Sequence, residues 1–407
     1  MEEVVIVGGG IAGLATAVAL RRVGFKCLVL ERAAELRAAG AAIGLFPNAF
    51  KALDSLGVTH KFLSIYRPME KAYVVNVDSG VSQEVSFTSN ASTPGEETQT
   101  RCVHRKALLE ALAEELPPNT IRFSSKLASI KTEKLNNSSS LVYVLHLEDG
   151  SVIRTKVLIG CDGLYSVVAQ WLGLSAPVKS GRSAVRGLAV FPEGHGFPYG
   201  PRQYLSNSKR AGFMPLNDKE LYWFMTHRTI DGEHELARDP QRIQKEVIEN
   251  LAKDFPEDYL NVVKHSDLSN LTIAPLNLRV PWDVFFGKTY SGTATVVGDA
   301  FHPMTPDMGQ GGCMALEDAV VLARSIANKR DKVAEGIENY VKERRWRVTS
   351  VLTGAFFSGW VQQGGSGVLW RIVELFRDSL FYKIVFAKMH DSIDKFDCGV
   401  LPCVSKD

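Results

Sequence analysis

The spacing of apolar and polar residues along the chain predicts a mixed α/β fold. Four continuous apolar runs are typical of parallel strands buried on both faces: residues 4–7, 27–30, 157–160 and 293–297. Residues 11–23, which follow the first run, are rich in Ala and Leu and are predicted to form a helix that ends at Gly24. A strand–helix–strand unit of this kind is typical of a Rossmann-like domain.

Other segments show a helical or a two-residue period. Helices are predicted at residues 47–56, 103–116, 314–327, 333–352 and 368–389. Antiparallel strands are predicted at residues 127–132, 141–147 and 152–155, with turns at residues 136–138 and 149–150. The polar segment at residues 88–100 is predicted to be a loop.

The pattern changes between about residues 183 and 282, where short apolar runs alternate with Gly and Pro turns around one predicted polar helix at residues 240–255. This indicates a second domain built on a mostly antiparallel sheet. We expect a discontinuous Rossmann-like domain (residues 1–75, 100–182 and 283–350), an inserted β-sheet domain (residues 76–99 and 183–282) and a C-terminal helical segment (residues 351–407).

Composition narrows the class of protein. Hydrophobic residues make up 45% of the chain and charged residues 23%, and the net charge of +2 argues against nucleic acid or an acidic membrane as the main partner. The six cysteines form no CxxC pair, which is typical of free thiols in a reducing compartment. Neither a secretory signal nor an apolar stretch of membrane-spanning length is present, so we expect a cytoplasmic protein, either a monomer or a homodimer.

A dinucleotide-binding fingerprint, Gly8-x-Gly10-x-x-Gly13, follows the first predicted strand. Gly8 permits a tight turn, Gly10 lets the backbone approach a pyrophosphate, and Gly13 lets helix and strand pack closely. The free N–H groups of the helix N-terminus, at Ile11 and Ala12, then face the phosphates.

An acidic residue stands at the end of the second predicted strand. Glu31, followed by Arg32, lies about 20 residues after the fingerprint, the usual distance for a carboxylate that binds a ribose hydroxyl. A carboxylate at this place argues against NADP, whose 2′-phosphate it would repel. The fingerprint by itself fits NAD, NADP or FAD.

A second motif comes late in the chain. Residues 297–306 read Val-Gly-Asp-Ala-Phe-His-Pro-Met-Thr-Pro and run into the glycine-rich segment 309–312. This stretch resembles the second flavin-contacting motif of the class A flavoprotein monooxygenases, the aromatic hydroxylases of the para-hydroxybenzoate and salicylate hydroxylase type. The resemblance extends to about residue 350. It implies a glutathione-reductase-type FAD-binding domain with an inserted substrate domain.

The resemblance assigns roles around the flavin. Asp299, after Gly298, would hydrogen-bond the ribityl chain, and Pro306 would lie beside the flavin ring. Backbone N–H groups at the start of the following helix would face the pyrimidine end of the flavin, where negative charge develops on reduction. The residues assigned there are Gly309, Gly311, Gly312 and Cys313, the last replacing an Asn that is usual in the family.

Three further segments resemble the family. Arg105 would contact the flavin, and Gly44 would lie near the ribityl chain. Asp162 and Ser166 match a middle motif, Asp-Gly-x-x-Ser-x-Val-Arg, but Ala169 replaces its final Arg. In the family that motif is linked to the FAD pyrophosphate and to NADPH. The loss of one positive charge is therefore expected to affect NADPH binding more than FAD binding.

The resemblance also implies a reaction. FAD, reduced by NADPH or NADH as a transient co-substrate, would react with molecular oxygen to form a flavin C4a-hydroperoxide that hydroxylates a small aromatic or phenolic substrate. In the bacterial FAD-dependent urate hydroxylase, an Arg and a Tyr on a hairpin contact the substrate, and the predicted hairpin 209–215 and 220–225 carries Arg210 and Tyr222 at these places. The alternative interpretation is an exposed Arg and a core-facing Tyr.

Other interpretations stay open. The same fold supports an epoxidase or an oxidase, and a flavin-binding protein without turnover would share the motifs. Catalytic-triad, metal-site and flavin-halogenase motifs are absent from the sequence, and segments 309–318 and 396–402 look most like the plant members of the family. His302 is expected to hold its loop rather than to act as a base, and the charged run 342–347 is expected to be a solvated helix face.

Overall fold

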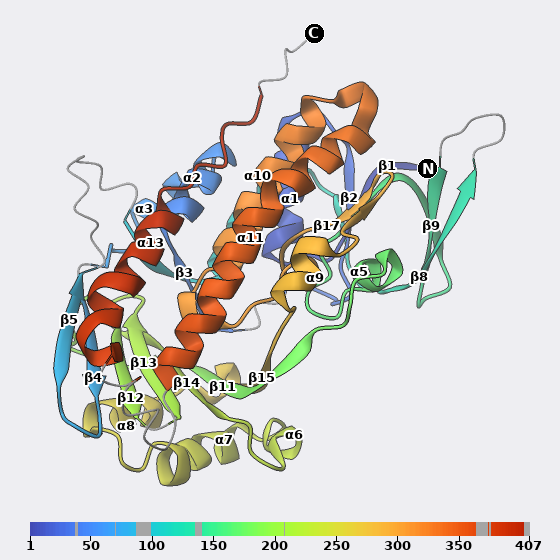
Figure 1. The fold of residues 1–407 in the computed structure, drawn as a ribbon. Helices are drawn as coiled ribbons and strands as arrows, with labels where there is room; N and C mark the ends of the chain where they lie inside the picture. Colours follow the sequence, from blue (N-terminus) through green and yellow to red (C-terminus); the bar gives the residue numbers. More distant parts are fainter. Residues whose placement is uncertain are drawn as a thin grey trace.

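The computed structural model describes residues 1–36, 40–69, 71–86, 99–134, 141–206, 208–363, 373 and 376–402. Within this part of the chain, the strands form two large sheets and a small pair, β3 (Ala42–Leu45) with β6 (Arg101–His104). Figure 1 shows the two large sheets as separate layers, with the long helix α11 (Val333–Gln363) running from one towards the other. The predicted loop at 88–100 and the turn at 136–138 lie almost wholly outside the described residues.

The first sheet confirms the Rossmann-like prediction. Its order is β16-β17-β10-β1-β2-β7, and β1, β2, β10 and β17 are parallel. The strands are β1 (Glu2–Val7), β2 (Cys27–Leu30), β7 (Ile121–Arg122), β10 (Val152–Gly160), β16 (Tyr290–Ser291) and β17 (Ala294–Val296). Two antiparallel strands, β8 (Leu127–Lys134) and β9 (Leu141–Leu147), extend it beyond β10.

One strand was predicted as two. β10 is continuous, whereas the sequence predicts separate strands at 152–155 and 157–160. Its first half pairs with β9 and alternates between buried and exposed residues, and its second half pairs with β1 and is buried throughout. The change from one-sided to two-sided burial, at Lys156, alters the pattern without ending the strand.

Helices cover the first sheet and connect its strands. Helix α1 (Ile11–Arg22) packs beside α10 (Gly311–Ala327), which begins slightly earlier than predicted. The others in this part of the fold are α2 (Pro47–Ser55), α3 (His60–Leu63), α4 (Arg105–Ala113), α5 (Val167–Leu172) and α9 (Pro281–Phe286).

The second sheet is mostly antiparallel, as predicted, in the order β15-β11-β14-β13-β12-β4-β5. Its strands are β4 (Lys71–Asn76), β5 (Ser82–Ser86), β11 (Val178–Val190), β12 (Arg202–Ser206), β13 (Lys209–Pro215), β14 (Glu220–Arg228) and β15 (Thr272–Leu278). The predicted hairpin is β13–β14. The domain boundaries stay a prediction, with one correction. Strand β4 was assigned to the Rossmann-like domain, but it belongs to the second sheet, because it pairs in parallel with β12.

The two faces of this sheet have different neighbours. Trp223 and Phe213 point into a separate core that is covered by helical segments. Tyr222 and Leu188, one residue out of phase, belong to the core of the first domain. The covering segments are α6 (Glu233–Leu236), α7 (Pro240–Glu246) with the π-helix η2 (Val247–Leu251), and α8 (Glu257–Lys264), where the sequence predicted one helix.

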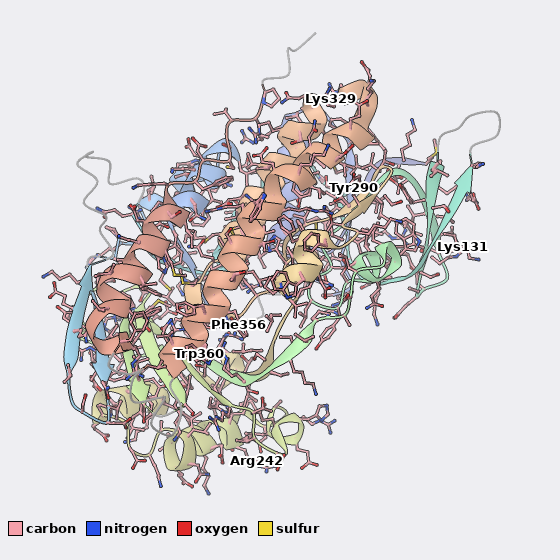
Figure 2. All side chains as sticks on the ribbon, in the orientation of Figure 1. Lys131, Arg242, Tyr290, Lys329, Phe356 and Trp360 are labelled. Carbon is pink, nitrogen blue, oxygen red and sulfur yellow. The ribbon has the colours of Figure 1, made fainter. Side chains whose placement is uncertain are left out.

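The C-terminal helices differ most from prediction. Helix α11 extends to Gln363 rather than to 352. The glycine at 359 serves close packing, since a Cβ there would lie 2.3 Å from the Asp307 carboxylate. Figure 2 shows Phe356 and Trp360 near the end of α11 that reaches the second sheet. The predicted helix 368–389 lies partly outside the described residues, and the described part forms η7 (Arg377–Phe386) and α13 (Ala387–Asp394). No helix in the described ranges is long and apolar enough to cross a membrane.

Candidate active site

Packing within the protein requires glycine at two of the three fingerprint positions. Gly8 has a φ of +105°, and a Cβ there would lie 2.3 Å from the carbonyl oxygen of Cys161. A Cβ at Gly13 would lie 1.8 Å from the carbonyl oxygen of Gly8, so the approach of α1 to β1 requires a glycine. A Cβ at Gly10 would meet no protein atom within 4 Å. Protein packing therefore does not require Gly10, and open space lies beside the first turn of α1.

The N-termini of α1 and α10 meet at this space. Neither helix has a side-chain cap, so the N–H groups of the first turns, including those of Ile11 and Gly311, are open to a ligand. Gly298 lies between the two turns, since its Cβ would be 2.9 Å from Ala12 and 3.3 Å from Ala315. Two partial positive charges thus converge where the parallel strands end, which favours an anionic ligand.

Glu31 is held at the edge of the same space. One carboxylate oxygen accepts a hydrogen bond from the Gly9 N–H (2.7 Å) and the other from the Ala33 N–H (2.7 Å). Each oxygen keeps a second lone pair for a sugar hydroxyl. Arg32 beside it is exposed.

Asp162 organises the start of α5. Its carboxylate accepts from the Ser166 hydroxyl (2.5 Å) and the Val167 N–H (2.7 Å), while Ser166 caps the helix by accepting from the Ala169 N–H (2.8 Å). Burial raises the pKa of Asp162 despite these bonds. Ala169, where the family carries Arg, is only 2% exposed and packs in an apolar core.

The late motif forms two short turns before α10. The segment η4 (Gly298–Ala300) leaves Asp299 exposed, and η5 (Pro306–Met308) ends at Gly309, whose φ of +66° favours glycine. The thiol of Cys313 donates to the Gly44 carbonyl (3.5 Å), which ties β3 to the start of α10. Burial raises the pKa of Cys313 to about 12, so the thiol is neutral.

His302 is fully buried, and its Nε2 lies 2.6 Å from Oδ2 of Asp318. The same oxygen accepts from the Gly298 N–H (2.9 Å). Burial opposes ionisation of Asp318, but His302 and Arg344 hold its pKa below the usual range. This geometry supports the structural role predicted for His302.

The prediction of a solvated face at residues 342–347 is wrong at Arg344. Arg344 is fully buried and binds Asp318 (2.6 Å) and Glu317 (2.7 Å) on α10, whereas Lys342 is exposed. Glu317 also accepts from the Asn48 amide (2.6 Å). The burial of Arg344 could not be predicted from the sequence, because its two carboxylate partners lie on another helix and the charged run does not indicate them.

Arg210 is neither exposed nor free. It donates to Gln203 (3.1 Å) and to Asp307 (3.3 Å). Arg182, which the sequence analysis did not single out, holds the same carboxylate in a bidentate pair (3.0 and 2.6 Å). Burial opposes ionisation of Asp307, but the two arginines keep its pKa low. This group, here called the Asp307 clamp, joins β11 and β13 to the turn that carries Pro306.

Tyr222 is buried on the same face of the sheet and interacts with Arg186 of β11. Burial raises the pKa of Tyr222, so its hydroxyl is neutral. Arg105, at the start of α4, is close enough to Asp299, Arg186 and Tyr222 to interact electrostatically with all of them. Arg186 was not predicted from the sequence, although a lone Arg in the apolar run 184–190 was a usable signal.

Known proteins resemble this chain along most of its length. Residues 1–355 match the FAD binding domain family. Monooxygenase 2 of Arabidopsis thaliana is 39% identical over 417 residues, covering 98% of both chains, and Monooxygenase 1 of the same plant is 38% identical over 416 residues, covering 98% of this chain and 100% of the relative. The crystal structure of Klebsiella pneumoniae HpxO complexed with FAD and uric acid superposes with a TM-score of 0.81 over 96% of each chain, at 23% identity.

Proposed function

The chain belongs to the FAD binding domain family, among the class A flavoprotein monooxygenases, and on that premise we propose that it uses NADPH or NADH and molecular oxygen to hydroxylate a small aromatic substrate. The observation that supports this most directly is the placement of the second sheet. Its inner face, with Tyr222 and Phe224, belongs to the core that also contains the first turns of α1 and α10. A planar ring bound at this face would lie beside the flavin.

The residues present fit FAD. The open space at Gly10 and the free N–H groups of α1 would receive the pyrophosphate, and Glu31 would bind the adenosine ribose. Asp299 and Arg105 would lie along the ribityl chain, and Gly311, with the start of α10, at the pyrimidine end. Bound FAD supplies electron transfer from the nicotinamide and oxygen transfer to the substrate.

The protein's own groups would orient the reactants and stabilise charge. The N–H groups at the start of α10 favour negative charge at the pyrimidine end. The Asp307 clamp holds the turn that carries Pro306, which would lie beside the flavin ring. The neutral Tyr222 hydroxyl would donate a hydrogen bond to the substrate. The uric acid bound to HpxO is consistent with a small, planar, oxygen-rich ring at the corresponding site.

The alternatives are separated by one experiment. FAD-loaded protein is mixed with NADPH or NADH in air containing ¹⁸O₂, against a panel of phenols, aromatic acids and urate. Product carrying one ¹⁸O atom, formed only with substrate and nicotinamide, is expected. Oxidation that yields only peroxide with every substrate would instead indicate an oxidase. An epoxide has the same mass as the hydroxylated product, so the product is identified by NMR, and an epoxide ring would indicate an epoxidase. Absence of flavin reduction under all conditions would point to a binding protein without turnover.

The matched variant is Tyr222→Phe, which removes one hydroxyl and keeps the ring. We expect kcat/KM for the best substrate to fall by about 10- to 100-fold, the usual loss for a buried hydrogen bond to a reacting group. An unchanged kcat/KM would remove Tyr222 from the proposed mechanism.

A further inference from the structure

Helices α9 and α11 carry a group of exposed aromatic side chains, here called the aromatic face. Its members are Trp282 and Phe286 of α9 and Trp346, Phe356, Phe357 and Trp360 of α11, with exposed fractions from 39% to 75%. Phe285 links the two helices, with its ring 4.7 Å from the Trp346 ring. Both helices lie at the front of the molecule in Figure 1, and Figure 2 labels Phe356 and Trp360 there. The proposed flavin and substrate contacts use none of these residues.

The size of the aromatic face matches one half of a protein interface. An aromatic side chain contributes about 150–250 Å² when it passes from full exposure to full burial. The exposed parts of these six side chains therefore offer roughly 700 Å². The largest apolar patch on a monomeric protein is usually about 300–600 Å², and a stable dimer buries about 800 Å² of each partner. The face is therefore large enough for a second copy of the chain once its polar neighbours are added.

The exposed side chains of α11 follow the spacing of a helix-pairing seam. They are separated by four, three, four and three residues, which keeps them on one side of the helix and is typical of the contact line between two paired helices. The seam consists of Trp346, Ser350, Thr353, Phe357 and Trp360. Residues 348–363 contain no charged side chain, and charged residues are depleted at the centres of protein interfaces.

The polar residues of the seam can be buried without losing hydrogen bonds. The Ser350 hydroxyl donates to the Trp346 carbonyl (2.8 Å), and the Thr353 hydroxyl donates to the Thr349 carbonyl (2.8 Å). Because both hydroxyls already have partners within the helix, removing them from water leaves neither donor unmet. Neither residue therefore has to stay in contact with water.

The seam is also complementary to itself. If two copies of α11 pair antiparallel around a twofold axis at Thr353, Trp346 of one copy meets Trp360 of the second copy, because each lies seven residues from Thr353. By the same count Phe356 meets Ser350, so a large side chain faces a small one. Helix α9 packs beside α11 and would extend the contact on both sides of the axis.

We propose that the aromatic face is a dimer interface, in which α11 pairs antiparallel with α11 of a second copy around a twofold axis at Thr353. This inference does not depend on the proposed function. A membrane surface fits less well, because the exposed charged residues Lys342 and Glu343 at the border of the face have opposite signs, whereas a helix that binds at a membrane surface is rich in Lys and Arg. The turn of α11 that carries Trp360 also packs Gly359 against the Asp307 carboxylate, so the dimer would hold this end of α11 against the Asp307 clamp.

Sedimentation velocity of the FAD-loaded protein, over a range of concentrations, measures its mass in solution. Wild type is expected to sediment with twice the mass of one chain. Trp346→Ala and Trp360→Ala should each raise the dimer dissociation constant by about 30-fold or more, the usual effect of removing a central tryptophan from an interface. Thr353→Arg should give a monomer, because the new charge meets its own copy at the axis. The control is Thr272→Arg, which adds the same charge at an exposed position on β15 and should remain dimeric.

A mixing experiment tests the register of the two helices. Thr353→Glu alone should also be monomeric, whereas an equal mixture of Thr353→Arg and Thr353→Glu should dimerise, because opposite charges then meet at the axis. The flavin content of each variant, equal to that of wild type, shows that loss of the dimer is not unfolding.

The proposal is overturned if wild type is a monomer at every concentration. If that monomer also co-sediments with vesicles of phosphatidylcholine and phosphatidylserine, the aromatic face binds a membrane instead. A dimer that survives Thr353→Arg, or one that the mixture does not restore, would place the interface elsewhere. The oxygenation assay is independent of these results, so failure of the dimer and failure of the proposed function are distinguishable.

Discussion

Replacing Gly10 with Ala adds one methyl group where the structure holds no protein atom within 4 Å. The backbone of Gly10, with φ −82° and ψ −171°, is accessible to Ala. Stability without FAD should therefore stay constant or rise by about 0.4–1 kcal/mol. With FAD, the methyl group would occupy the space assigned to the pyrophosphate. Overpacking of this kind costs about 1–3 kcal/mol, which corresponds to about 5- to 150-fold weaker FAD binding.

Gly13→Ala is the matched control, because its methyl group would lie 1.8 Å from the Gly8 carbonyl oxygen. Helix α1 would have to move away from β1, so this variant should lose about 1–3 kcal/mol of stability even without FAD. Urea unfolding of the apoprotein measures the first quantity, and quenching of FAD fluorescence on titration measures the second. Wild-type FAD affinity in Gly10→Ala, or destabilisation equal to that of Gly13→Ala, would refute the assignment of this space to the pyrophosphate.

Three further predictions concern buried charge. Asp307→Asn leaves two arginines without a carboxylate and should lower the free energy of unfolding in urea by about 3–5 kcal/mol. Because the pKa of Asp307 is depressed in the folded protein, the stabilisation is present above the ordinary carboxyl pKa and is lost as pH falls through the folded pKa. The stability difference between wild type and Asp307→Asn should therefore shrink in acid, and a pH-independent difference would contradict this. Arg344→Gln should also cost about 3–5 kcal/mol whereas exposed Lys342→Gln costs less than about 0.5 kcal/mol, so equal effects would mean that Arg344 is solvated. Ala169→Arg, which restores the family residue, should lower stability by about 3 kcal/mol or more because it buries a charge in an apolar core, and an unchanged Tm would show that the side chain escapes to solvent.

Much of the fold was predictable because its signals are local. A parallel strand buried on both faces needs a continuous apolar run, and the hairpin β13–β14 needs alternating residues and a turn. The bounds of an element were predicted wrongly where a tertiary contact interrupts its pattern of apolar and polar residues. Strand β10 changes partners at Lys156. Helix α11 contains a glycine at 359, which weakens the helical signal, because the Asp307 carboxylate leaves no room for a side chain there.

The sequence by itself determined the dinucleotide-binding fingerprint, the Gly-Asp motif and the hairpin with Arg210 and Tyr222, since each depends on residues close together in the chain. Only the tertiary structure decided which partner each charged side chain has. Arg210 is occupied by Asp307, and Arg344 is buried against carboxylates on α10. Arg186 joins Tyr222 through the register of β11 and β14. The physical reason is that the partner of a buried charge is set by strand register and helix packing between distant segments, which no local pattern encodes.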